Sequence, residues 1–152
     1  MKIFIDGDGS PVKDEAIEIS LNYQLETVIV TSIDHYSRKD YPSLVSVVYV
    51  DKGSDAADYR IIGLIKSGDI VVTQDYGLAS LALQKGAAAI HQKGTEYTPQ
   101  TIDLLLEQRH FSGKIRKSGG RTKGPKPFTK EDREQFKESL SALIQKNKSS
   151  TA

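Results

Sequence analysis

The chain lacks cysteine altogether, and none of its apolar runs approaches the length that a membrane span requires. Without cysteine, disulfide bonds, thiolate zinc sites and thiol catalysis are excluded. No signal-peptide pattern, in which a basic segment is followed by an apolar one, precedes the first predicted strand. We therefore expect a cytoplasmic protein with no membrane partner. The 152 residues fit one domain, and a charged fraction of 27% is ordinary for a globular protein.

The net charge of +1 conceals an uneven distribution along the chain. Residues 1–108 contain 9 Lys and Arg against 16 Asp and Glu, whereas residues 109–152 contain 12 against 4. Seven basic residues and no acid lie between Arg109 and Lys126. Such a basic segment either binds the acidic surface of its own protein or binds a polyanion such as nucleic acid.

Short apolar runs rich in β-branched residues alternate with helical patterns, which is typical of a parallel sheet. Strands are predicted at residues 2–6, 27–31, 44–50, 70–73 and 87–91. Helices are predicted from Ser10-Pro11 to about residue 23, over 55–66, over 76–85 and from Thr98, with a loop at 32–43. We therefore predict a single-domain α/β fold, in which a parallel β-sheet is flanked by helices.

The composition changes after residue 111. Residues 112–128 are rich in glycine and basic residues, which predicts a mobile arm. Thr129 then caps an amphipathic helix, and Asp132 lies at its third position, where the helix dipole favours a carboxylate. The predicted organisation is a core (1–111), the arm (112–128), a C-terminal helix that packs on the core (129–147) and a tail (148–152).

Aspartates follow three of the predicted strands. Asp6 and Asp8, in "IFIDGDGSPV", follow the first strand, and Asp75, in "VVTQD", follows the fourth. Asp55 and Asp58, in "GSDAAD", lie three residues apart at the start of the helix after the third strand, so both project from one face. Because the carboxyl ends of parallel strands meet at one edge of the sheet, we expect all five carboxylates to converge there.

Crowded carboxylates repel one another, and a hard divalent cation removes this penalty. One or two such ions activate water and stabilise charge at a phosphodiester. Gly7 and Gly9 would let the backbone approach a phosphate or the metal. For Asp55 alone, a helix cap is the commoner role. We predict a site for Mg²⁺ or Mn²⁺ with the metal-binding residues Asp6, Asp8, Asp55, Asp58 and Asp75, of which Asp6, Asp8, Asp58 and Asp75 are catalytic.

Five stretches of the sequence, in this order, resemble the YaiI/YqxD family of bacterial proteins: "DGDGSPVK", "GSDAADYRI", "SGDIVVTQDYGLASLALQKGA", "RHFSGKIRKSGGRTKGPKPF" and "KEDREQF". The resemblance covers nearly the whole chain and implies a fold similar to the PIN-like nuclease domain, with an acidic, metal-binding rim. It maps the five aspartates onto the acidic positions of the family motifs. The first family motif usually reads D-A-D-A-C-P-V. Here glycines replace the alanines and Ser10 replaces the cysteine, which leaves the carboxylates intact.

These observations predict a metal-dependent phosphodiesterase, a nuclease with RNA rather than DNA as its substrate. Lys and Arg side chains of the arm would contact backbone phosphates without reading the sequence. The predicted nucleic-acid-binding residues are Lys114, Arg116, Lys117, Arg121, Lys123 and Lys126. The seven tyrosines are scattered and predict no stacking platform.

Two alternatives stay open at this point. The first is a non-catalytic nucleic-acid or protein-binding module of PIN-like fold, because a binder needs only the basic arm. The second is a phosphatase of the haloacid-dehalogenase type, because a strand followed by D-x-D-G resembles the start of that family. The later stretches of the chain favour the nuclease over the phosphatase, and the retention of all five acids favours the nuclease over the binding module.

Overall fold

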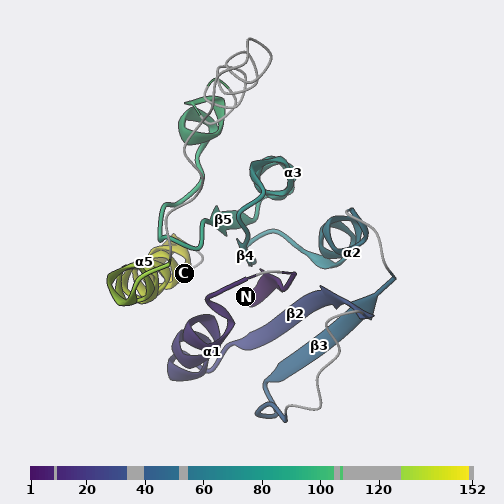
Figure 1. Ribbon diagram of the computed structural model, residues 1–152. Coiled ribbons are helices and arrows are strands. Elements are labelled where there is room, and N and C mark those ends of the chain that lie inside the picture. Colours follow the sequence, from purple (N-terminus) through teal and green to yellow (C-terminus); the bar gives the residue numbers. More distant parts are fainter. Residues whose placement is uncertain (9, 34–39, 52–54, 105–106, 108–127, 151–152) are drawn as a thin grey trace.

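The computed structural model describes residues 1–8, 10–33, 40–51, 55–104, 107 and 128–150. At its centre lies a five-stranded sheet with the strand order β3-β2-β1-β4-β5, in which every pairing is parallel. The strands are β1 (Lys2–Asp6), β2 (Glu26–Ser32), β3 (Val45–Val50), β4 (Ile70–Val72) and β5 (Ala88–Ile90). The predicted single-domain, parallel α/β fold is confirmed (Figure 1).

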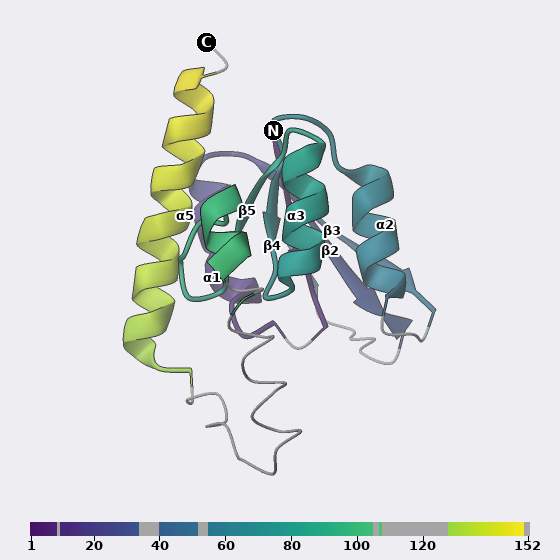
Figure 2. The ribbon, with the colours of Figure 1, turned by 90° about the horizontal axis from the view of Figure 1, so that it is seen from above.

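Helices cover both faces of this sheet (Figure 1). On one face lie α1 (Lys13–Asn22) and α5 (Lys130–Ser150), and on the other lie α2 (Ala56–Leu64) and α3 (Tyr76–Gln84). Right-handed crossovers place these helices on opposite faces. The connection through α1 moves from β1 outward to β2, whereas the connection through α2 moves in the opposite direction, from β3 to β4. Seen from above in Figure 2, α5 runs along the domain beside α1. None of the helices in the described ranges is long and apolar enough to cross a membrane.

Residues alternate between the two faces along each strand. Ile3 and Ile5 of β1 are fully buried on the face that α1 and α5 cover. Phe4, which lies between them, packs on the opposite face with Ile61 of α2. Asp6 lies two residues after Phe4 on the same strand, so its side chain points to the same face of the sheet, the one that α2 and α3 cover.

The start of α1 differs from the sequence prediction. The helix begins at Lys13, two residues after Pro11, and Val12 occupies the N-cap position without a side-chain capping bond. Ser10 Oγ instead accepts a hydrogen bond from the Val12 N–H, at 3.4 Å. A serine hydroxyl that bonds to the N–H two residues later stabilises a turn in competition with the helix. Ser10 and Pro11 therefore lie in a turn before α1.

The predicted cap of the C-terminal helix is confirmed. The Asp132 N–H donates to Thr129 Oγ1, and the Thr129 N–H donates to Asp132 Oδ2, both at 3.0 Å. This reciprocal pair is a capping box, and the Thr129 backbone bond lowers the pKa of Asp132. Arg133 donates to the carbonyl oxygen of Pro11 and to Glu15 Oε1, so α5 is fixed to the segment that follows β1. The basic residues predicted for the arm lie outside the described residues.

Asp69 joins the start of β4 to the start of β1. Its side chain is 6% exposed; Oδ1 accepts from the Lys2 N–H and Oδ2 accepts from the Lys66 N–H, both at 2.9 Å. Replacing Asp69 by alanine is expected to lower the free energy of unfolding by about 2 kcal/mol, because two partly buried donors lose a charged acceptor. Urea denaturation beside Asp103→Ala, at an exposed position, measures the effect. A loss below about 0.5 kcal/mol, within the range of ordinary surface substitutions, would contradict it.

Candidate functional site

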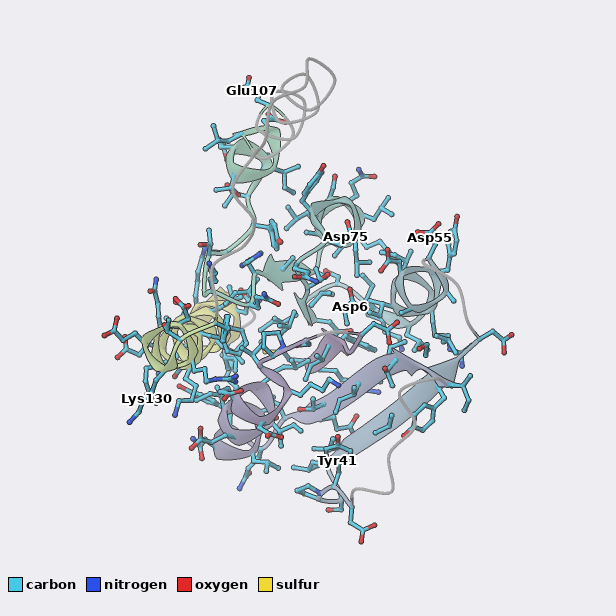
Figure 3. All side chains as sticks on the ribbon, viewed as in Figure 1. Asp6, Tyr41, Asp55, Asp75, Glu107 and Lys130 are labelled. Carbon is cyan, nitrogen blue, oxygen red and sulfur yellow. The ribbon has the colours of Figure 1, made fainter. Side chains whose placement is uncertain are left out.

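The order of the strands reverses between β1 and β4, because β2 and β3 continue on one side and β5 on the other. In open parallel sheets, ligands bind in the crevice outside the carboxyl ends of two such strands. Asp6 ends β1, and Asp75 lies three residues after β4. Figure 3 shows Asp6 and Asp75 at this place and Asp55 at the start of α2. The acids predicted from the sequence therefore border the expected ligand position.

Thr73 links the ends of the two strands. Its Oγ1 donates to Asp6 Oδ2 and accepts a hydrogen bond from the Asp75 N–H, both at 3.0 Å. Tyr97, which is 2% exposed, supports this residue because its hydroxyl donates to the Thr73 carbonyl oxygen at 3.1 Å. Burial raises the pKa of Asp6 against the opposing effect of the Thr73 bond, and the charges of Asp8 and Asp75 raise it further.

Asp75 is the N-cap residue of α3. Its Oδ1 accepts hydrogen bonds from the N–H groups of Gly77 (2.8 Å) and Leu78 (3.3 Å). These bonds hold the carboxylate at the helix N-terminus, where the dipole favours negative charge. The sequence predicted Asp75 as a site residue, and the structure adds this capping role.

Asp58, from the first turn of α2, completes the group. Burial raises its pKa to about 7, together with the charges of Asp6 and Asp75, a side-chain hydrogen bond with Asp75 and the charge of Asp55. Two carboxyl groups can share a hydrogen bond only when one of them carries a proton, so this bond favours the neutral form of Asp58. We call Asp6, Asp58 and Asp75 the acid edge.

Asp8 and Asp55 lie beside the acid edge. Asp8 Oδ1 accepts hydrogen bonds from Thr31 Oγ1 (2.8 Å) and from the Ser32 N–H (2.9 Å), which direct the carboxyl group toward the end of β2. Asp55 occupies the N-cap position of α2, is exposed and makes no side-chain capping bond. The charges of Asp8 and Asp55 raise the pKa values of Asp6 and Asp58 respectively, while a backbone hydrogen bond from Asp8 to Asp6 lowers the pKa of Asp6.

The described ranges contain no group of three or more His, Cys, Asp or Glu side chains arranged to hold a metal ion. This corrects the expectation of five converging metal ligands. The carboxyl groups are held by other partners: Asp8 by the end of β2, Asp75 by the N–H groups of α3, and Asp58 by Asp75. The chemistry of the donors still fits a hard divalent cation, because the charged neighbours that raise the pKa values of Asp6 and Asp58 are all carboxylates.

Gly7 serves packing in this structure. Its N–H donates to the Val30 carbonyl oxygen at 2.7 Å, and an added Cβ would lie 2.9 Å from Ile29 Cγ2. The sequence suggested an approach to a phosphate or metal, whereas the close approach at Gly7 is to β2. It holds the segment between Asp6 and Asp8 against that strand.

A cavity of about 10 Å³, near the volume that one water molecule needs, borders Asp6 and Asp8. Thr73 and Gln92 also line it, and the sequence analysis missed both. Thr73 had a signal, because a hydroxyl residue at the end of a strand, two positions before an aspartate, is well placed to bond a carboxylate. Gln92 had none, since only the pairing of β5 with β4 brings it there.

Comparison with known proteins gives a consistent picture. Residues 4–146 match a family profile described as "Uncharacterized BCR, YaiI/YqxD family". A UPF0178 protein of Enterococcus faecalis is 63% identical over 147 residues, which cover 97% of this chain and 99% of that protein. UPF0178 proteins of Bacillus cereus and Bacillus anthracis are 52% and 51% identical over 144 residues, which cover 95% of this chain and 99% of theirs. No solved structure shows a significant match.

Proposed function

This chain belongs to the YaiI/YqxD family, and we propose that it is a metal-dependent phosphodiesterase that cleaves RNA. The acid edge carries the proposal. Asp6, Asp58 and Asp75 border the place where the order of a parallel sheet reverses, and neighbouring carboxylates raise the pKa values of Asp6 and Asp58. Mutual repulsion of this kind is costly in a protein that uses the acids only for folding, and it is typical of catalytic sites.

Asp6, Asp58 and Asp75 would hold Mg²⁺ or Mn²⁺ only after their side chains move closer together, because the described residues contain no group of three acids arranged around an ion. The ion supplies Lewis acidity and neutralises charge on a phosphate when it is bound. The protein already orients two of these carboxylates, Asp6 through Thr73 and Asp75 through the N–H groups of α3. Oriented groups need little reorganisation when charge develops in the transition state. Asp8, which borders the small cavity, would orient a water molecule.

The expected substrate follows from the distribution of charge. The acid edge alone would repel a polyanion, whereas the segment between Arg109 and Lys126 carries seven basic residues. Phosphate contacts from Lys and Arg give affinity without sequence readout and make binding sensitive to salt. The haloacid-dehalogenase alternative needs Asp8 as a free acid or base, and the bonds of Asp8 Oδ1 to Thr31 and Ser32 disfavour this role.

The test incubates end-labelled single-stranded RNA with purified protein and Mn²⁺, beside an EDTA control. We expect cleavage that EDTA and Asp58→Asn abolish and that Asp103→Asn, a matched change at an exposed aspartate, leaves intact. Equal cleavage by wild-type protein and Asp58→Asn would indicate a contaminating nuclease and overturn the proposal. RNA binding without cleavage under every condition would favour the non-catalytic module.

A further inference from the structure

A second feature of the carboxyl edge lies beside the acid edge, at the outer strand of the sheet. The end of β3 and the first turns of α2 border an open, shallow hollow of about 520 Å³. We call it the β3–α2 hollow. Its lining residues are Tyr49, Val50, Asp51, Ala56, Tyr59 and Arg60. Tyr49 and Tyr59, ten residues apart in the sequence, thus border one depression.

Tyr59 is the distinctive residue of the hollow, because 76% of this large aromatic side chain is exposed. It follows Asp58 directly and lies one helical turn after Asp55, so α2 carries both an acid of the acid edge and an aromatic residue of the hollow. A ligand that bridges the acid edge and the hollow therefore passes over the first turns of α2.

The charges around the hollow decide which part of a nucleic acid fits. Asp51 lines the hollow and Asp55 lies at the start of the same helix, so a phosphate would be repelled. A base is uncharged, and bases stack on aromatic rings and on the guanidinium plane of arginine, here Arg60. Asp51 adds a carboxylate acceptor, which suits the exocyclic amino group of a base.

We propose that the β3–α2 hollow binds an unpaired base of a single-stranded nucleic acid, next to the phosphodiester at the acid edge, with Tyr59 and Arg60 as the stacking surface. This inference rests on the proposed function for the identity of the ligand. Asp51 favours the bases that carry an exocyclic amino group (cytosine, adenine and guanine) over uracil, whose only base donor is the N3–H. The substrate class is thereby narrowed to single-stranded RNA, since the bases of a duplex are stacked and paired.

The experiment measures binding without cleavage, in EDTA, with 5′-fluorescein-labelled RNA octamers of cytidine, adenosine or uridine. Because the chain has no tryptophan, Tyr59→Trp introduces a single reporter whose emission a stacked base quenches. Leu81→Trp, at a half-exposed position of α3, is the matched control.

We expect octacytidine to quench the tryptophan emission of Tyr59→Trp and not that of Leu81→Trp. Tyr59→Ala should weaken binding about tenfold, and Tyr59→Phe should not, because base stacking contributes about 1–3 kcal/mol. Asp51→Ala should remove the preference for octacytidine over octauridine.

Each result has a defined meaning. Binding of the octamers without quenching of Tyr59→Trp, or with full affinity in Tyr59→Ala, overturns the base site and leaves the phosphodiesterase proposal standing. Quenching without metal-dependent cleavage retains the base site and overturns the phosphodiesterase. Failure of all octamers to bind overturns the inference and favours a peptide as the occupant of the hollow.

Discussion

Replacing Asp58 by asparagine is expected to stabilise the metal-free protein at pH 8 by about 1 kcal/mol, because asparagine cannot ionise. The pKa of Asp58 is about 7 in the folded protein, against a usual value of 3.8, through burial and the charges of Asp6 and Asp75. Between pH 4 and 7 the native state therefore holds a proton that the unfolded chain has released. The stability of the wild-type protein consequently falls as the pH rises through this window. Solvent around the partly buried side chain screens much of the effect.

Urea denaturation in EDTA at pH 5 and pH 8 measures this difference. The stability gap between Asp58→Asn and the wild-type protein should widen from pH 5 to pH 8, whereas Asp103→Asn should show a constant gap. The pKa of Asp6 is also raised, so the variant keeps a weaker pH dependence of the same sign. An equal gap at both pH values would mean that Asp58 does not feel the neighbouring carboxylates.

The same substitution is expected to weaken Mn²⁺ binding roughly 100-fold, since loss of one member of a desolvated charge pair costs about 2–5 kcal/mol. The wild-type protein should bind Mn²⁺ more tightly as the pH rises through 7, because the ion displaces the proton of Asp58. Titration calorimetry in two buffers of different ionisation enthalpy would detect the released proton. Unchanged affinity in Asp58→Asn would remove Asp58 from the ligands.

Phe136→Ala is expected to cost about 3–5 kcal/mol of stability, because it opens a cavity in the core. Phe136 comes from α5 and is fully buried on the face of the sheet that includes Ile3 and Ile5. A typical domain is stable by only about 5–15 kcal/mol, so this one side chain supports a large share of the fold. Since Arg133 of α5 also binds the segment after β1, loosening α5 should disturb the neighbourhood of Asp8.

Urea denaturation of Phe136→Ala beside Phe136→Leu and Leu81→Ala tests this expectation. Phe136→Leu keeps most of the volume and should cost less than half as much, and the half-exposed Leu81 should matter little. A loss below about 1 kcal/mol for Phe136→Ala would show that α5 is not part of the core.

The class of fold could be predicted from the sequence, because strands that are buried on both faces, such as residues 27–31, are continuous apolar runs that are easily recognised. The cap of α5 was equally readable, since Thr129 and Asp132 bond to each other across one turn. The start of α1 was not. Ser10 and Pro11 have the residue types of a helix start, whereas in the structure the Ser10 hydroxyl accepts from the Val12 N–H and stabilises a turn before the helix.

The positions of the acids after β1 and β4, and at the start of α2, were determined by the sequence, because the carboxyl ends of all strands in a parallel sheet lie at one edge. The tertiary structure decided which acids meet. The pairing of β1 with β4 brings Thr73 to Asp6, the parity of β1 turns Asp6 toward α2, and the Thr31 hydroxyl draws Asp8 away. The orientations of Asp6 and Asp8 depend on hydrogen bonds to residues that are distant in the sequence: Thr73 lies 67 positions after Asp6, and Thr31 lies 23 positions after Asp8. Local sequence patterns carry no information over such separations.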